Sequence, residues 1–437
     1  ALTPAEVRAC CQPPDTPVDE PAIGFIRYAW RHMTSDAPMP RHLPEAVMEV
    51  ALASDDPFYR HALMHNLYVL LFLTPDTLQE AFVEKLQSTW NPHSEDDHLP
   101  PERTHLLDLL LCDWLMAQND RVTAHHLLHE RVLPAMTRLP KEGALMAVVL
   151  DLELSWPELI DSDDEDEREQ YKQGLWQIIE LLEDMPQFRL KRAALFEIAT
   201  RFALFDGSFS EALGYANKAM ALAEELAVPD LVQRMLLLKG EVLLSWAHAG
   251  DQPQFYDQAL KVFQQLARSV DAEANPELYA VVQEYIGTIF VHKPVEEKKR
   301  GIMAGMAEAA FQEAVQVAKN NGLEHLYARI CNNYANALQS FPDSRFTDKY
   351  EKALYYYQEA LDRRPADQFP TERAFTQANY LQAALHLPQL DEPMVRDLKR
   401  RAEEVIELSP NAELRAMAED ILGLLEHLLE SEFFSKK

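Results

Sequence analysis

Glycine is scarce in this chain of 437 residues, which contains only 12 glycines. An average usage of about 7% would give about 31. Glycine is needed mainly where the backbone takes a positive φ, in tight turns and at the C-terminal ends of helices. A chain that uses so little of it is typical of helices joined by short connections. The 27 prolines agree with this, because many lie between apolar segments, where they begin or end helices.

Cysteine and long apolar segments are also rare. The chain has four cysteines with no CxxC pair and no spaced framework, no run of 18 apolar residues and no signal-peptide pattern at its start. We therefore expect reduced thiols, no membrane-spanning helix and a cytoplasmic location. The cysteines are Cys10, Cys11, Cys112 and Cys331.

Positive charge is in short supply, with 41 Lys and Arg residues against 71 Asp and Glu and a formal net charge of −30. Such a surface repels nucleic acid and anionic membranes unless its basic residues gather in one patch. The densest basic runs, at 296–300 and 396–404, are both interrupted by glutamate. We expect no direct binding to nucleic acid or membrane. A basic or neutral protein or peptide partner fits better, as does membership of a multiprotein assembly.

No motif of an enzyme active site is present. The sequence has no GxSxG, no P-loop and no GxGxxG after a strand. Cys331 lies inside a helical pattern, whereas a reactive cysteine is favoured at a helix N-terminus, where the dipole lowers the pKa of the thiol. We expect Cys331 to pack in the core, and the sequence predicts neither catalytic residues nor a cofactor.

Two histidine pairs have the i, i+4 spacing of two zinc ligands on one helix face. They are His61 with His65 and His125 with His129. The metalloprotease arrangement needs a glutamate directly after its first histidine, but His126 follows His125. No third ligand can be named, so an amphipathic helix surface is favoured over a metal site.

Apolar residues recur at spacings of three and four in almost every long segment, which predicts an all-α protein. The sharpest change in composition is the run 161–169, in which seven of nine residues are acidic. We expect this run to form an exposed loop or the first turn of a helix, where negative charge suits the helix dipole. It separates a divergent helical N-terminal domain (1–160) and a connecting segment (161–189) from a repeat region with a C-terminal capping helix (190–437).

Four segments of that repeat region share one pattern of small and bulky residues at positions i, i+4 and i+7, which form one helix face. The first position holds Ala212, Ala259, Ala307 and Ala353, the second Ala216, Phe263, Phe311 and Tyr357, and the third Ala219, Leu266, Ala314 and Ala360. Alanine allows a neighbouring helix to approach closely. Another amphipathic helix precedes each segment, and a fifth pair follows.

The region from about 190 to 410 therefore resembles tetratricopeptide repeats, of a divergent bacterial type. The segments 332–338 and 369–385 are most similar to the divergent repeats of large bacterial signalling and defence proteins. Gly240, Gly287 and Ala335 match the small residue of the first helix in each pair, and Pro365 and Pro410 match the closing proline. The resemblance implies a right-handed α-solenoid of antiparallel helix pairs.

Some features depart from the family pattern. Thr200 and Leu381 stand where the family has glycine or alanine. Residues 247–256, 292–305 and 340–349 form connections that look longer than the family's three-residue turns, and we expect them to be partner-specific loops. Within the tyrosines of 355–357, we expect Tyr357 in the core, Tyr356 on a flanking face and Tyr355 open to a partner.

In tetratricopeptide arrays the first helices line a concave groove that holds peptides. The resemblance therefore implies a partner-binding surface of polar residues on these helices, with Glu197 and Glu241 facing the same groove. Asparagine and glutamine amides can hydrogen-bond an extended peptide backbone as donors and acceptors, or can bond neighbouring helices instead. The expected partner-binding residues are Arg201, Arg234, Arg329, Asn332, Asn336, Gln339, Asn379 and Gln382.

The function predicted from these patterns is a non-enzymatic scaffold that binds a protein or peptide segment in the groove. A regulatory sensor, whose superhelix changes shape on binding a peptide or small ligand, stays open as an alternative. A metal-dependent enzyme that uses the N-terminal histidine helices is less favoured.

Overall fold

A computed structural model describes residues 120–430 except 140, 161, 251 and 344–347, together with residues 105, 108, 109, 112, 113, 115 and 116. All regular structure in these residues is helical, so the predicted all-α fold is confirmed. The chain divides into two compact units, Ala1–Ile178 and Ile179–Lys437. No described helix is long and apolar enough to cross a membrane. The pair His61 and His65 and the cysteines Cys10 and Cys11 lie outside the described residues.

In the first unit, the described chain forms α7 (Arg121–Leu127), a π-helical turn (Leu128–Val132), a 3₁₀ turn (Leu133–Arg138) and α8 (Lys141–Ile160), before α9 (Glu165–Leu181) runs across the boundary. The acidic run supplies the first turn of α9, which is one of the two structures expected for it, the other being an exposed loop. The Asp164 carboxylate accepts a hydrogen bond from the Glu167 amide (3.0 Å), which stabilises the start of this helix.

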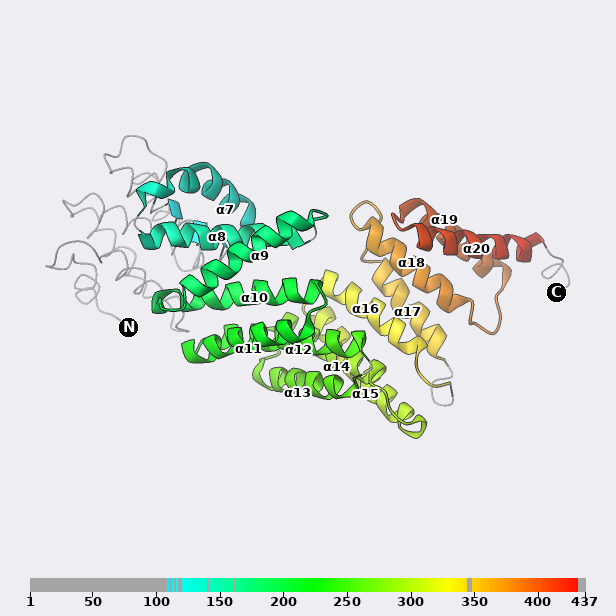
Figure 1. Cartoon of the computed structure of the whole chain (residues 1–437). Helices are drawn as coiled ribbons and strands as arrows, with labels where there is room; N and C mark the ends of the chain where they lie inside the picture. The colour runs from blue at the N-terminus through cyan, green and yellow to red at the C-terminus, as the bar shows by residue number, and fades with distance from the viewer. Residues whose placement is uncertain are drawn as a thin grey trace, which may run out of the picture. The chain divides into compact units, whose positions relative to one another are not determined.

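The second unit is a series of helices that pack in consecutive pairs (Figure 1). The first helix of each pair also contacts the first helix of the next pair. The first helices are α10 (Arg189–Phe205), α12 (Pro229–Ala249), α14 (Pro276–His292), α16 (Glu324–Gln339) and α18 (Pro370–Ala384). The second helices are α11 (Phe209–Leu226), α13 (Pro253–Ser269), α15 (Glu297–Asn320), α17 (Lys349–Leu361) and α19 (Glu392–Leu408), after which α20 (Ala412–Glu430) packs against α19 and α18.

Glycines of the first helices receive aromatic rings from the second helices. A Cβ atom built on Gly240 would lie 2.5 Å from the Phe263 ring, and one on Gly287 would lie 2.8 Å from the Phe311 ring. Both phenylalanines are buried, at 0% and 1% exposure. The small residue in one helix and the bulky residue in its partner are thus two sides of one close contact, which explains why they recur together along the sequence.

In the first pair, α10 has a larger residue at the position where α12 and α14 have glycine. Thr200 of α10 is fully buried, and its hydroxyl donates to the Phe196 carbonyl one turn earlier (2.8 Å). In α11 the position that holds phenylalanine in the next two pairs is Ala216, also fully buried. A larger residue in the first helix of this pair is thus accompanied by a smaller one in the second helix, and both are buried.

The expectation of three long loops was wrong for two of them. Helix α12 ends at Ala249 and α13 begins at Pro253, so this connection is three residues long. Between α14 and α15 only residues 293–296 are non-helical, and the rest of the insert extends α15 at its N-terminus. Proline at the first position of α13 is compatible with the helix, because that residue needs no amide hydrogen there. Of the three, only the connection between Gln339 of α16 and Lys349 of α17 is longer.

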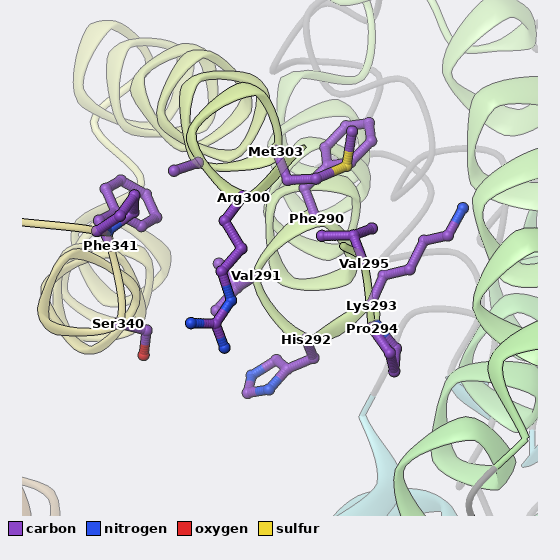
Figure 2. A pocket seen from close by; sticks show the side chains of 12 residues that line it. Phe290, Val291, His292, Lys293, Pro294, Val295, Arg300, Met303, Ser340 and Phe341 are labelled. Atoms are coloured by element: carbon purple, nitrogen blue, oxygen red, sulfur yellow. The ribbon is translucent and has the colours of Figure 1, made fainter. Parts of the chain in front are cut away.

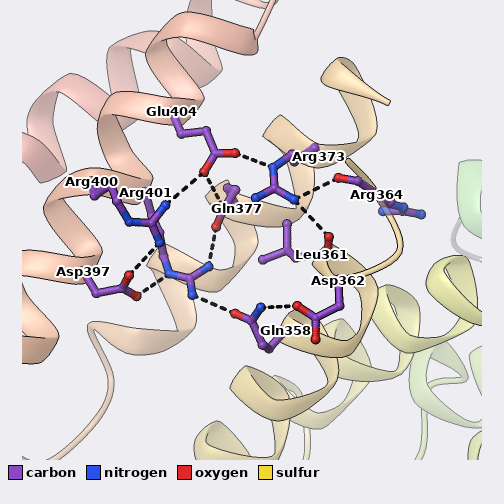
Figure 3. A network of polar contacts seen from close by, with 10 residues as sticks. All are labelled: Gln358, Leu361, Asp362, Arg364, Arg373, Gln377, Asp397, Arg400, Arg401 and Glu404. Atoms are coloured by element: carbon purple, nitrogen blue, oxygen red, sulfur yellow. Dashed lines mark hydrogen bonds and ion pairs between the residues drawn. The ribbon is translucent and has the colours of Figure 1, made fainter. Parts of the chain in front are cut away.

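A polar network fixes α18 between its neighbours α17 and α19 (Figure 3). Arg401 of α19 is 7% exposed and donates to the Gln377 amide oxygen (2.8 Å), to Gln358 of α17 (2.7 Å) and to Asp397 (2.6 Å). Its guanidinium also lies over the Tyr380 ring, 4.0 Å from the centroid. The partners of Arg401 lie on α17, α18 and α19, so the network specifies the register of these three helices relative to one another.

Candidate functional site: the polar face of the first helices

The polar residues expected to bind a partner lie on successive first helices, and several of them are linked by side-chain contacts between neighbouring helices. Arg234 of α12 reaches Glu197 of α10, and Arg329 of α16 reaches Glu284 of α14. Asn379 of α18 donates to Asn332 of α16 at 3.5 Å. We call this connected surface the first-helix face. It has a charged half on α10, α12 and α14, extended by Arg329, and an amide half on α16 and α18.

In the charged half, each of the expected arginines is already paired with a carboxylate. Glu197 accepts from Arg201 at 3.0 Å and from Arg234 at 3.1 Å. Glu284 is 5% exposed and pairs with Arg329 at 2.7 Å. The arginines therefore do not offer three unopposed positive charges to a partner, and the charged half is close to electrically neutral.

Glu241 has the most unusual environment in this half. The Tyr285 hydroxyl donates to its carboxylate at 2.8 Å across the α12–α14 contact. Burial raises the pKa of the Glu241 carboxyl, and neighbouring Glu197 adds to this, whereas the Tyr285 hydrogen bond and the charges of Arg201 and Arg329 oppose it. The balance leaves the ionised form less favoured than in water.

In the amide half, hydrogen bonds run in series from α18 to the charged half. Asn332 donates to the neighbouring Asn333 (3.2 Å), and Asn333 donates to the buried Glu284 (2.7 Å). Gln382, farther along α18, is exposed and donates to the Met417 sulfur at 3.0 Å. An amide offers two donor hydrogens and an oxygen acceptor, and these contacts use only part of that capacity.

Asn336 and Gln339 have a structural partner that the sequence did not reveal. The Tyr357 side chain is fully buried in α17, and its hydroxyl reaches the first-helix face. Gln339 donates to this hydroxyl at 2.7 Å, and the hydroxyl in turn donates to the Asn336 oxygen. These two amides satisfy a buried polar group, which is the alternative role left open for the amides.

The three neighbouring tyrosines occupy three environments, as expected. Tyr357 is in the core, Tyr356 is partly buried with its ring 4.5 Å from Tyr334, and Tyr355 is 55% exposed. The single run therefore carries a core residue, a flanking residue and a surface residue on one helix.

Sequence reasoning missed Glu284 and Asn333, which join the two halves. It also missed Tyr285, which links α14 to α12 within the charged half. Glu284 is a buried carboxylate in the otherwise apolar pattern of α14, three residues before Gly287. A charged residue on an apolar helix stripe is the signal that could have revealed it, since such residues are rarely buried unless paired.

A cavity of about 340 Å³ opens beside the amide half, between α14 and α16. Asn333 and Asn336 line it from α16, and Thr288 and His292 line it from α14. None of its lining residues is acidic; they are Thr288, Val291, His292, Phe311, Asn333, Asn336, Ala337 and Ser340.

The histidine pair of the first unit forms surface contacts. The rings of His125 and His129 stack with centroids 4.1 Å apart, which confirms that they share a helix face. His129 pairs with Asp151 at 2.9 Å and His126 with Glu130 at 3.3 Å. Among the residues that the structure describes, no group of three or more His, Cys, Asp or Glu side chains is arranged to hold a metal ion.

Cys331 packs in the core, as predicted. It is fully buried in α16, and burial raises the pKa of its thiol to about 12. The thiol is therefore protonated at neutral pH, which is the opposite of what a nucleophilic cysteine requires.

The fold is a TPR-like helical repeat. The apo form of the quorum sensor NprR from B. thuringiensis is similar over 83% of this chain and 96% of its own, with 16% identity and a TM-score of 0.51. The STAND protein PH0952 from Pyrococcus horikoshii, which has a tetratricopeptide repeat sensor, is similar over 99% of this chain and 70% of its own, with 12% identity and a TM-score of 0.49. No protein-family model and no curated protein matches the sequence.

Proposed function

We propose that this protein is a non-enzymatic scaffold that binds an extended protein or peptide segment along its first-helix face. The observation that carries the proposal is the continuous series of polar side chains across five consecutive first helices, from Glu197 to Gln382. A segment lying across these helices would meet hydrogen-bonding groups at each one.

The charge of the face supports a partner that is neutral or basic. The arginines of the charged half are neutralised by glutamates on the face itself, and the amide half carries no charge. The chain as a whole is strongly acidic, at −30. Long-range attraction therefore favours basic segments, whereas contact specificity comes from hydrogen bonds to the partner's backbone.

Within the amide half, we assign backbone recognition chiefly to Asn332, Asn379 and Gln382. Asn332 and Asn379 are half-buried and Gln382 is exposed, and none of them bonds a buried side chain. Asn336 and Gln339 line the same face, but they also hold the Tyr357 hydroxyl. The three arginines of the charged half would contribute to binding by exchanging their present glutamate partners for acceptors of the bound segment. They are Arg201, Arg234 and Arg329.

The experiment is selection from a display library of random linear peptides, with the whole chain as bait, followed by titration of an enriched peptide. Replacing Asn332 and Asn379 by alanine should weaken binding about tenfold or more, because each lost backbone hydrogen bond is worth about 1 kcal/mol. A matched control is Gln316→Ala with Asn320→Ala, an amide pair (2.7 Å) on α15, which should leave affinity unchanged.

Failure to enrich any peptide, or equal affinities for both double variants, would remove the assignment of the first-helix face. A change in hydrodynamic radius on binding the same peptide would favour the sensor alternative over a rigid scaffold. Zinc found in the purified chain would instead support the metal-dependent alternative.

A further inference from the structure

A second pocket, of about 320 Å³, lies where the extended N-terminus of α15 meets the ends of α14 and α16 (Figure 2). It differs from the first-helix face in being built from connections and helix ends, namely residues 293–295 and 340–342. It shares Val291, His292 and Ser340 with the cavity beside the amide half. Its size is at the lower end of the roughly 300–1,000 Å³ typical of small-ligand pockets.

The sign of charge in this pocket is opposite to that of the chain. Its twelve lining residues include Lys293 and Arg300 but no aspartate or glutamate, although acidic residues outnumber basic ones 71 to 41 in the sequence. Lys293 is paired with Asp257 of α13, and in Figure 2 its side chain extends away from Arg300. Arg300 is therefore the cation that this pocket can offer to a ligand.

The Arg300 guanidinium can change partners at little cost. It pairs with Glu297 one turn earlier at 3.2 Å, and the two side chains are 62% and 79% exposed. Pairs of this kind contribute little to stability because water screens them. In Figure 2 the Arg300 side chain extends along the pocket toward His292. A planar guanidinium suits bidentate binding of a carboxylate.

The remainder of the pocket combines apolar walls with two further polar groups. Phe290 and Phe341 are 7% and 3% exposed, and Val295 and Met303 are partly buried. The Ser340 hydroxyl and the His292 ring are the polar groups. The ring packs edge-on against His248 at 5.0 Å between centroids, which fixes its position at the end of α14. The lining thus combines hydrogen-bonding groups with apolar side chains.

We propose that this pocket binds a small carboxylic acid with an aliphatic or aromatic body, with the carboxylate at Arg300 and the body against Val295, Met303 and the two phenylalanines. This site is separate from the peptide-binding assignment of the first-helix face and does not rest on it. The pocket shares walls with the cavity that Asn333 and Asn336 line. A ligand in the pocket would therefore change the surroundings of these two asparagines.

The test is calorimetric titration of the whole chain with octanoate and with 3-phenylpropionate, each beside its uncharged primary amide. The acids should bind. The amides should bind at least about tenfold more weakly, because an uncharged amide cannot form a charge-assisted pair with Arg300. Arg300→Gln should weaken acid binding by a similar factor. The matched control is Lys298→Gln, which removes an exposed charge two residues before Arg300. Lys298 pairs with Glu296 and does not line the pocket, so this variant should bind the acids as the wild type does.

A second variant tests the apolar part without touching the charge. Ala304 is 5% exposed and lines the pocket, so Ala304→Leu should occupy the space and abolish binding, provided that its melting temperature shows the chain is folded. Absence of acid binding up to about 10 mM, or equal binding of acid and amide, would overturn the proposal. Binding of a tripeptide with a free apolar C-terminal residue, but of neither acid, would overturn it in favour of a peptide terminus. Because Asn332→Ala with Asn379→Ala lies outside this pocket, its failure or success reports on the first-helix face alone.

Discussion

The two halves of the first-helix face show two ways of placing polar groups on helices that must also pack. In the charged half, glutamates accept from arginines of the same helix or of a neighbouring helix, so that each of the three arginine charges is neutralised by a residue of the same face. In the amide half, uncharged side chains bond one another and the buried Tyr357 hydroxyl. Neutralised charges fix the spacing of helices, whereas amides retain unused donors and acceptors for a partner.

The comparison assigns stability mainly to the charged half and binding mainly to the amide half. The contact between the two halves is Glu284, which accepts from Arg329 and from Asn333. Four substitutions test this division of roles, and their expected effects decrease in the order given.

The largest effect should come from Glu284→Ala. This change removes the buried carboxylate that accepts from both Arg329 and Asn333, so we expect the free energy of unfolding to fall by about 2 kcal/mol. Urea denaturation followed by circular dichroism measures it. Glu284→Gln keeps an acceptor and should lose less. An unchanged transition midpoint for the alanine variant would contradict a joining role.

Tyr357→Phe should have the next largest effect. It removes one buried hydroxyl, which donates to Asn336 and accepts from Gln339, and the loss of these hydrogen bonds should cost about 1 kcal/mol. Because both amides then become available, affinity for a selected peptide should stay equal or rise. A loss of affinity with unchanged stability would instead assign Tyr357 to the partner-binding surface.

Glu241→Gln should have a smaller effect that depends on pH. Burial raises the pKa of this carboxyl in the folded chain. Its contribution therefore favours folding below the ordinary glutamate pKa of about 4 and is lost as the pH rises from there through the raised pKa of the folded state. The glutamine variant should therefore be slightly more stable than the wild type at neutral pH, with the difference shrinking on acidification. The exposed Glu419→Gln on α20 is a control that should show no such trend. A glutamine variant that is less stable at neutral pH would mean that the Tyr285 and arginine contacts outweigh burial.

The smallest effect should come from Arg234→Gln. Its pair with Glu197 is 54% exposed on the arginine side, and Glu197 keeps Arg201 as a second partner. We expect a change within about 0.5 kcal/mol in thermal unfolding. A loss comparable to that of Glu284→Ala would show that the charged half acts as one cooperative network.

The helical class and the repeat could be predicted because they depend on local spacing. The recurrence of Ala353, Tyr357 and Ala360 at matching positions in other segments follows from one helix face meeting one neighbour. Local spacing could not show that two of the three expected loops are short, because a stretch such as 296–305 is compatible with either an exposed helix or a loop. Its membership of α15 is clear only from the structure.

Local patterns were enough to predict the all-α fold, the pairing of small with bulky residues, and which polar residues lie on first helices, because helical periodicity and side-chain volume are local properties. What those polar residues contact is visible only in the folded chain. Arg329 pairs with a glutamate 45 positions earlier, Asn336 holds a tyrosine of the next helix, and Arg300 meets residues near 340 in a pocket without acidic groups. Such contacts join residues far apart in sequence, and no local pattern encodes the distance between them.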